Sequence, residues 1–225
     1  MEPPETAESG WRIYDVLKRV MDIAISSVVL IAAAPLCLLI AIAIRLTSSG
    51  SALYRQRAAV GRGGRSFTLY KFRTMRDDAQ DTSHREAIAR FVKGEIVAHQ
   101  EAKGALGPVY KMVNDPRVTR LGRFLRKTGL DEIPQFYNVV RGDMSIVGPR
   151  PPVAYEYEQY DERQRRRLAI RPGITGLYQV SARSQVSLER MVEIDLEYIR
   201  RRSFTLDLSI MLRTPWVMFS GRGAY

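Results

Sequence analysis

Two adjacent carboxylates, Asp131 and Glu132, are the residues of this sequence best suited to chemistry. They begin the stretch LDEIPQFYNVVRGDMSIVGPRP, Leu130–Pro151, in which further charged residues alternate with turn-forming glycines and prolines. Carboxylate oxygens bind Mg²⁺ and guanidinium groups bind phosphate, so this pattern suits a site that handles both. A structural interpretation is also open, with Asp131 as the N-cap of a helix and Glu132 in its first turn.

Two predicted helices flank the carboxylate pair. Residues 118–127 predict an amphipathic helix whose apolar stripe consists of Val118, Leu121, Phe124 and Leu125. A second helix is predicted from Asp131 towards Val140, which would place both carboxylates at a helix N-terminus. The unpaired amides and the dipole of a helix N-terminus favour an anionic group such as phosphate.

The composition indicates an anionic partner. The chain has 225 residues, a formal net charge of +11 and 45% hydrophobic residues, which is enough for a folded core. Such a positive charge is typical of proteins that bind nucleic acid, an acidic membrane surface or a phosphorylated substrate. The single cysteine, Cys37, excludes an intramolecular disulfide.

An uncharged apolar run covers residues 23–44 and is long enough to cross a bilayer of about 30 Å as a helix. Pro35 near its middle predicts a kink. Positive charge lies on both flanks, so the positive-inside preference gives no orientation for a straight crossing. A re-entrant segment with both ends on one face and an ordinary kinked span therefore both remain open.

A β-hairpin is predicted where two alternating segments, residues 51–60 and 65–75, flank Gly61–Gly64. In its second strand Phe67, Leu69 and Phe72 are expected on one face. Lys71 and Arg73 begin a basic patch on this strand. The patch is interpreted either as a solvated strand face or as a surface for anionic groups.

The region Asp77–Pro108 is polar and is interpreted as an insert. Its histidines, His84 and His99, have no ligand partners at metal spacing. After Pro152, residues 154–170 predict one charged amphipathic helix, and residues 171–184 a turn-rich, mostly extended segment.

A further helix is predicted after Ser187 as its N-cap, running through residues 188–202. Asp195 falls on its apolar face, where a carboxylate needs an arginine or a metal as partner. The ion-paired structural role is favoured over the metal role. The C-terminal segment 204–219 is amphipathic and is expected at the membrane interface.

Four segments together resemble the bacterial sugar transferase family, the monotopic phosphoglycosyl transferases. They are KRVMDIAISSVVLIAAAPLCLLI, LYKFRTM, DPRVTRLGRFLRKTGLDEIPQFYNVVRGDMSIVGPRP and RPGITGLYQVSARS. The resemblance covers the chain from about Lys18 to its C-terminus, and the motifs LDE-x-P-Q, RGDMS-x-VGPRP and RPGITG in this order are specific. The compact form is similar to members that initiate exopolysaccharide synthesis.

The resemblance implies transfer of hexose-1-phosphate from a UDP-hexose to undecaprenyl phosphate, with release of UMP. It implies that Asp131 is the nucleophile, forming a phosphosugar-aspartate, and that Glu132 binds Mg²⁺ beside it. Asp143 and Asp195 are weaker candidates for the metal. The candidates for binding substrate phosphates are Lys71, Arg73, Arg126, Arg150 and Arg171.

The resemblance also implies a mainly helical α+β fold. An N-terminal tail and interface segment at 1–17 would precede a re-entrant membrane helix at 18–47. A cytosolic, membrane-associated catalytic domain at 48–225 would hold the β-hairpin and interfacial amphipathic helices. The implied location is the bacterial inner membrane, with this domain on the cytoplasmic face and in contact with membrane lipids. The family's membrane helix breaks at Ser-Pro, whereas this chain has Ala34-Pro35.

The alternative function is a membrane-tethered polyanion-binding or scaffold protein, suggested by the net charge. No nucleic-acid motif accompanies the arginines, which are scattered over several segments, so nucleic acid is not an expected partner. A homodimer is an open possibility, and the sequence does not specify the hexose.

Overall fold

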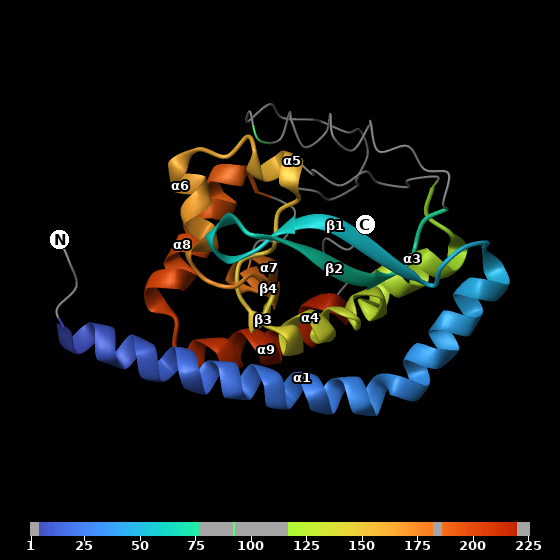
Figure 1. The fold of residues 1–225 in the computed structure, drawn as a ribbon, viewed down its shortest axis with the longest axis horizontal. Coiled ribbons are helices and arrows are strands. Elements are labelled where there is room, and N and C mark those ends of the chain that lie inside the picture. Colours follow the sequence, from blue (N-terminus) through green and yellow to red (C-terminus); the bar gives the residue numbers. More distant parts are fainter. Residues whose placement is uncertain (1–4, 77–91, 93–116, 182–185, 220–225) are drawn as a thin grey trace.

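A computed structural model describes residues 5–76, 92, 117–181 and 186–219, and their side chains from Ile13 to Met218 (Figure 1). In this part of the chain helices predominate, and the predicted mainly helical α+β class is confirmed. The predicted insert Asp77–Pro108, with both histidines, lies outside the described residues apart from Val92.

One long helix, α1 (Glu5–Thr47), runs along the edge of the molecule and bends towards its C-terminal end, with Pro35 in its interior (Figure 1). The expectation of a non-helical tail is therefore wrong from Glu5 onward.

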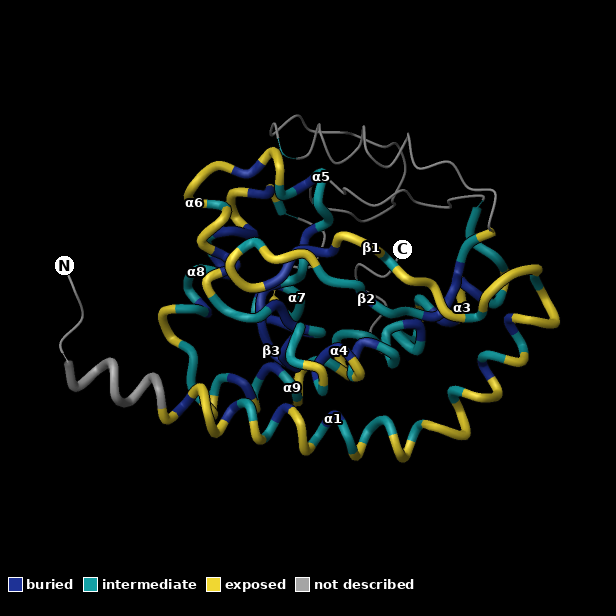
Figure 2. Tube along the Cα trace, in the orientation of Figure 1, coloured by how far each residue is buried: buried dark blue, intermediate teal, exposed yellow. Residues whose placement is uncertain are grey.

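The two ends of α1 contact the same globular body. Its N-terminal half packs on α4 (Gln135–Arg141) and β3 (Ser145–Val147), and Ile40 and Ile44 pack near its C-terminus against Phe72 and Leu125. The outer side of α1 is exposed and apolar (Figure 2). In the described residues, α1 is the one helix long and apolar enough to cross a membrane, and 11% of its most apolar window is buried.

The predicted hairpin is confirmed as β1 (Leu53–Val60) paired antiparallel with β2 (Ser66–Phe72), joined by the 3₁₀ turn η1 (Arg62–Gly64). The expected common face is wrong for Phe72. Side chains alternate along a strand, so Leu69 enters the main core while Phe72 packs on the C-terminal end of α1.

The helix predicted at 118–127 is α3 (Arg120–Thr128), with Thr119 as its N-cap. Leu125 is buried, but Phe124 is 55% exposed, so the predicted stripe is wrong at that residue. The second predicted helix begins at the 3₁₀ turn η2 (Leu130–Glu132) and continues through α4. Asp131 is inside η2 and makes no capping hydrogen bond, so the N-cap interpretation is also wrong. Gly129, at φ 69°, separates η2 from α3.

The motifs RGDMS-x-VGPRP and RPGITG contribute two short parallel strands, a pairing that was not predicted. β3 pairs with β4 (Gly173–Thr175), and Gly148 lies against the backbone of the RPGITG motif. A Cβ at Gly173 would lie 2.1 Å from the Gly148 nitrogen, and one at Gly176 2.3 Å from the Gly148 oxygen. The glycines therefore allow two backbones to touch, which explains part of both motifs structurally.

The single helix expected at 154–170 is wrong. The segment forms α5 (Ala154–Tyr157), α6 (Glu162–Arg165) and the 3₁₀ turn η3 (Arg166–Ala169). Asp161 restarts the helix through a reciprocal capping box with Gln164. The expected extended segment gives β4 and α7 (Leu177–Ser181).

The last two helices follow the prediction. α8 (Leu188–Arg201) starts at its N-cap Ser187, and α9 covers Phe204–Phe219. The main core lies where α1, α4, β3, α8 and α9 meet the hairpin. Its buried residues are Ala59, Leu69, Val139, Met144, Ile146, Val147, Tyr198 and Ile210.

A buried ionic cluster fixes the N-terminal half of α1 to α9. Asp207 is 0% exposed and accepts hydrogen bonds from Lys18 Nζ at 2.8 Å, from the Tyr14 hydroxyl at 2.8 Å and from the Tyr198 hydroxyl at 2.7 Å. Lys18, which precedes the apolar run, is thus an ion-pair partner in the core.

Candidate active site

Asp131 lies in η2, which contacts both α3 and β2. Its side chain is buried, and Glu132 follows it directly. Burial, and then the negative charge of Glu132, raise the pKa of Asp131 to about 6, while the positive charges of Lys71 and Arg126 act in the opposite direction. The structure thus brings together four of the predicted site residues. A raised pKa at such a cluster is characteristic of functional carboxylates.

Arg126 is held in place by the end of β2. Its Nε donates to the Thr74 hydroxyl oxygen at 2.9 Å, and α3 packs directly on the Thr74 backbone. A Cβ at Gly122 would lie 2.1 Å from the Thr74 carbonyl oxygen, so only glycine permits this approach. Thr74 and Gly122 were missed as positioning residues. Gly122 and Arg126 are four residues apart and so lie on the same face of the predicted helix, which was the signal in the sequence that could have indicated them.

Lys71 and Arg73 lie two positions apart on β2 but have different roles. Lys71 acts electrostatically on Asp131. Arg73 is buried, and its Nη2 donates to the backbone oxygen of Ser48 at 3.0 Å and to its hydroxyl at 2.8 Å. Arg73 thereby satisfies a carbonyl just beyond the end of α1. In the described part of the chain its Nε is buried and has no hydrogen-bond partner.

Asn138, also missed, ties the helix that follows Asp131 to the hairpin. It is fully buried; its Nδ2 donates to the Thr68 carbonyl at 2.7 Å and its Oδ1 accepts from the Tyr70 amide at 3.1 Å. The Asn138 side chain thus pairs with the backbone groups that a neighbouring strand would otherwise pair with at the free edge of β2, and it fixes α4 against β2. These hydrogen bonds hold η2 at a set distance from Lys71.

Arg150 belongs to a different cluster. Its carbonyl accepts from Arg167 Nη2 at 3.5 Å, and its charge acts on the Tyr160 hydroxyl. Arg167 is itself buried and donates to Asp195 at 2.7 Å. Asp195 therefore has the arginine partner that the structural interpretation required, and its oxygen is occupied by an ion pair rather than turned towards Asp131.

Arg171 and Asp143 lie at the other end of α4. Arg171 Nε donates to the Gly142 carbonyl at 2.9 Å, and Asp143 forms an ion pair with Arg141 at 3.4 Å. The helical path from Asp131 to Gly142 spans roughly 17 Å at about 1.5 Å per residue. These two candidates are consequently not part of the group around Asp131.

The Asp131–Glu132 pair fits a magnesium ion. In the described residues no group of three or more acidic, histidine or cysteine side chains could hold a metal. Mg²⁺, however, is commonly bound by one or two carboxylates together with substrate phosphates and water. The pKa of Asp131 is raised first by burial and then by the negative charge of Glu132, and a divalent cation would offset the second of these effects.

Comparison with known proteins agrees with this geometry. The family model described as bacterial sugar transferase matches residues 13–221. The chain belongs to the bacterial sugar transferase family. The resemblance seen in the sequence motifs is thereby confirmed, and the matched region includes α1 from Ile13 onward, the Asp131 group and α9.

Several named relatives of this family are similar to the chain. The exopolysaccharide production protein ExoY of Rhizobium meliloti is 38% identical over 222 residues, which is 99% of this chain and 94% of that protein. The galactosyl transferase CpsE of Streptococcus agalactiae is 44% identical over 176 residues, 78% of this chain and 36% of that protein. The Escherichia coli UDP-glucose:undecaprenyl-phosphate glucose-1-phosphate transferase is 36% identical over 218 residues, covering 93% and 42% respectively. The chain thus spans well under half the length of the latter two relatives.

Proposed function

We propose that this chain transfers hexose-1-phosphate from a UDP-hexose to undecaprenyl phosphate and so initiates exopolysaccharide or glycoconjugate assembly. The observation that carries the proposal is a buried aspartate, Asp131, with Glu132 beside it and the charges of Lys71 and Arg126 acting on it. The names of relatives support the substrates, since the Escherichia coli relative is named for UDP-glucose and undecaprenyl phosphate.

The proposed reaction has two displacements at phosphorus. A carboxylate oxygen of Asp131 attacks the sugar-bearing phosphorus of the UDP-hexose, the bond to the bridging oxygen breaks, and UMP leaves. A phosphate oxygen of undecaprenyl phosphate then attacks the same phosphorus, and the aspartate carboxylate is regenerated. Lys71 and Arg126 neutralise charge on the phosphates during both steps, because phosphoryl transfer depends mostly on positioning and electrostatics.

Mg²⁺ would be held by Glu132 and Asp131, and when bound it would neutralise charge on the diphosphate of the donor. Arg150 is proposed as a further residue that binds a phosphate of the UDP-hexose.

The direct test is UMP release from a panel of UDP-sugars in the presence of undecaprenyl phosphate and Mg²⁺. Release with one or more UDP-hexoses that requires both components supports the proposal, and the panel identifies the hexose. No release with any of them, from a folded protein in lipid nanodiscs, would contradict it.

The rate of the first displacement should fall in acid. Attack needs ionised Asp131, and burial raises its pKa to about 6, so the ionised fraction rises as pH increases through that value. Single-turnover UMP release without acceptor lipid should therefore drop about tenfold per pH unit below about pH 6. Higher Mg²⁺ concentration should move this limb to lower pH, since a cation favours the carboxylate. A rate independent of pH between about 4 and 7 would exclude this role for Asp131.

We further propose that α1 is re-entrant and that its exposed outer side lies in the cytoplasmic leaflet of the inner membrane. Its N-terminal half is joined to Asp207 and its C-terminal end to Phe72 and Leu125, so both ends attach to one body. The exposed stripe Phe204, Leu208, Leu212 and Trp216 of α9 would lie at the same interface.

Cysteine labelling tests this topology. In a Cys37→Ala background, Ser9→Cys and Ser51→Cys should both react with a membrane-impermeant reagent from the cytoplasmic side only. Labelling of the two positions from opposite sides of the membrane would establish a true crossing.

A further inference from the structure

A second group of arginines lies at the C-terminal end of α4, away from Asp131. Arg19 of α1 donates to the carbonyls of Val139 at 2.6 Å and Val140 at 2.9 Å. Arg171 donates through Nε to the Gly142 carbonyl at 2.9 Å, and Arg141 precedes that glycine. Gly142 has φ 95°, and a Cβ there would lie 3.2 Å from Arg19 Nη2, so its lack of a side chain makes room for this convergence.

Capping the helix does not use all the donors of this group. Both terminal nitrogens of Arg19 donate hydrogen bonds to α4 carbonyls, whereas Arg171 donates only through Nε. Among the described residues, the two terminal nitrogens of Arg171 have no hydrogen-bond partner. Arg141 is ion-paired through its own Nε to Asp143, its side chain is 48% exposed, and its guanidinium lies 5.9 Å from the Tyr137 ring centre. The terminal nitrogens of Arg171 and Arg141, two residues whose side chains or backbone meet at the Gly142 turn, are thus available to a ligand.

The charge of the group is not balanced by the protein. Three guanidinium groups, Arg19, Arg141 and Arg171, face two carboxylates, Asp143 and Asp22. Asp143 also accepts from Asn138 Nδ2 at 3.2 Å, and Asp22 accepts from the Ile146 amide at 3.2 Å. Lys18 is neutralised separately by Asp207. One further negative charge would complete the group, and a phosphodiester supplies it together with oxygens that match a guanidinium fork.

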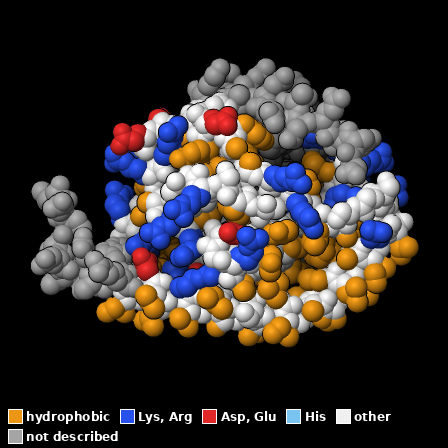
Figure 3. Space-filling model, in the orientation of Figure 1, with side chains coloured by type: hydrophobic (Ala, Val, Ile, Leu, Met, Phe, Trp, Pro, Cys, Tyr) orange, Lys and Arg blue, Asp and Glu red, His pale blue; other side chains and the backbone are white. Residues whose placement is uncertain are grey.

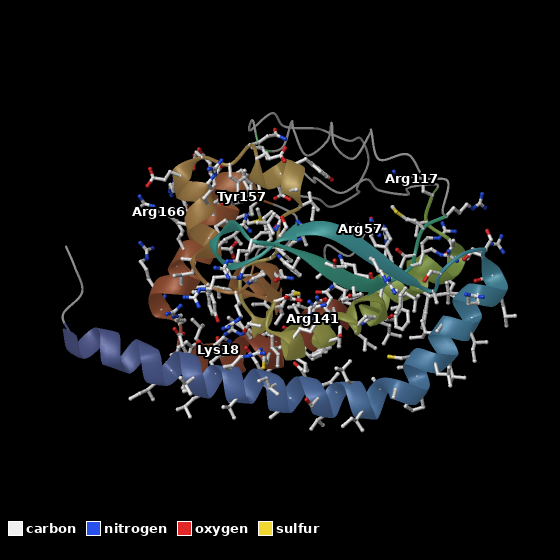
Figure 4. All side chains as sticks on the ribbon, viewed as in Figure 1. Lys18, Arg57, Arg117, Arg141, Tyr157 and Arg166 are labelled. Atoms are coloured by element: carbon white, nitrogen blue, oxygen red, sulfur yellow. The ribbon has the colours of Figure 1, made fainter. Side chains whose placement is uncertain are left out.

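The position of the group suits a lipid phosphate. Arg19 lies on α1 between Val16, 63% exposed, and Val20, 61% exposed, which belong to the apolar outer side. Lysine and arginine side chains lie directly above the apolar rim of the molecule in Figure 3, and Arg141 lies between α4 and α1 in Figure 4. Basic groups at this level of a membrane protein bind anionic headgroups, each cation contributing about 1 kcal/mol.

We propose that Arg19, Arg141 and Arg171 form a binding site for the headgroup phosphate of an anionic membrane phospholipid. The inference rests on the proposed membrane placement of α1. The reacting phosphate cannot be the occupant of this site while it is attacked, because Gly142 lies roughly 17 Å along the helix from Asp131. The site anchors the catalytic body on the bilayer and sets its height relative to the lipid surface.

Lipid retention tests the proposal without relying on catalysis. The full chain, carrying Asp131→Asn to remove turnover, is reconstituted in nanodiscs of phosphatidylcholine with phosphatidylglycerol, and co-purified phosphatidylglycerol is measured by native mass spectrometry. Arg141→Gln should lower phosphatidylglycerol affinity about fivefold, and adding Arg171→Gln about 25-fold, at about 1 kcal/mol each. Arg166→Gln, an exposed arginine paired with Glu162 on α6, is the matched control and should have no effect.

Three results would overturn the site. Equal retention in Arg141→Gln and wild type is one, because this half-exposed residue can be replaced without loss of the fold. Retention that does not discriminate phosphatidylglycerol from phosphatidylcholine is the second. Displacement of phosphatidylglycerol by equimolar undecaprenyl phosphate is the third, since it would assign the group to the acceptor substrate. Failure of the proposed enzymatic function would appear separately, as absent UMP release from the Asp131-containing protein.

Discussion

Replacing Asp131 by asparagine is expected to lower UMP release from UDP-hexose by at least about 10³-fold, because the amide removes the proposed nucleophile. The substitution keeps the size of the side chain and the packing of η2. The measurement is steady-state UMP release with undecaprenyl phosphate and Mg²⁺. Undiminished turnover in the Asp131→Asn variant would end the assignment of this residue as nucleophile.

The same variant should be more stable than the wild type at neutral pH, which separates lost chemistry from lost folding. The native pKa of Asp131, about 6, lies above its ordinary value of 3.8, so the native state binds more protons than the unfolded state between these values. Wild-type stability therefore falls as pH rises from about 4 to 6, by at most about 3 kcal/mol. The asparagine variant should lack this fall in urea or thermal unfolding.

Glu132→Gln provides the companion measurement. It keeps the nucleophile but removes the proposed metal ligand, so the Mg²⁺ concentration for half-maximal UMP release should rise while turnover remains detectable. An unchanged Mg²⁺ dependence would place the metal elsewhere.

The second large effect is expected on stability, from Asp207→Ala. The substitution removes the ion-pair partner of the buried Lys18 ammonium and the acceptor for Tyr14 and Tyr198. Breaking a buried ion pair on one side costs roughly 3–5 kcal/mol. The expected outcome is a large drop in melting temperature and loosening of α1 from α9, measured by hydrogen exchange of the α1 amides.

A surface pair is the control for this prediction. Glu197→Ala breaks the exposed ion pair with Arg201, which has an N–O distance of 2.6 Å, and should change stability by less than about 1 kcal/mol. If Asp207→Ala were as mild as Glu197→Ala, the buried cluster would not be what joins α1 to α9.

The sequence was informative where a single local rule decides the structure. The alternation on both sides of Gly61–Gly64 predicted the hairpin, and Ser187 as a capping residue predicted the start of α8. The apolar run and Pro35 predicted a long bent helix. The pairing of Asp195 with an arginine also followed from one rule, that a buried carboxylate needs a partner.

Local rules failed where distant contacts decide. The pattern around Asp131 indicated an N-cap. Gly129, with its left-handed backbone, instead ends α3 and places Asp131 inside a 3₁₀ turn. The helix expected after Pro152 ends at Tyr157 and a new one starts after the N-cap Asp161, and beyond it Arg167 is buried in an ion pair with Asp195, 28 residues away. Nothing in the spacing of Arg171 indicated that it lies at the far end of α4 from Asp131, because β4 carries it there by pairing with β3.

The most direct test of the account is to isolate the proposed phosphosugar-aspartate. The wild-type protein is incubated with Mg²⁺ and its UDP-hexose without undecaprenyl phosphate, quenched, and examined by intact mass and peptide mapping. We expect a mass increase of one hexose phosphate, located on Asp131, a matching burst of UMP, and disappearance of the adduct when undecaprenyl phosphate is added. Full turnover with no adduct on the wild type, or an adduct that persists in Asp131→Asn, would contradict the central claim.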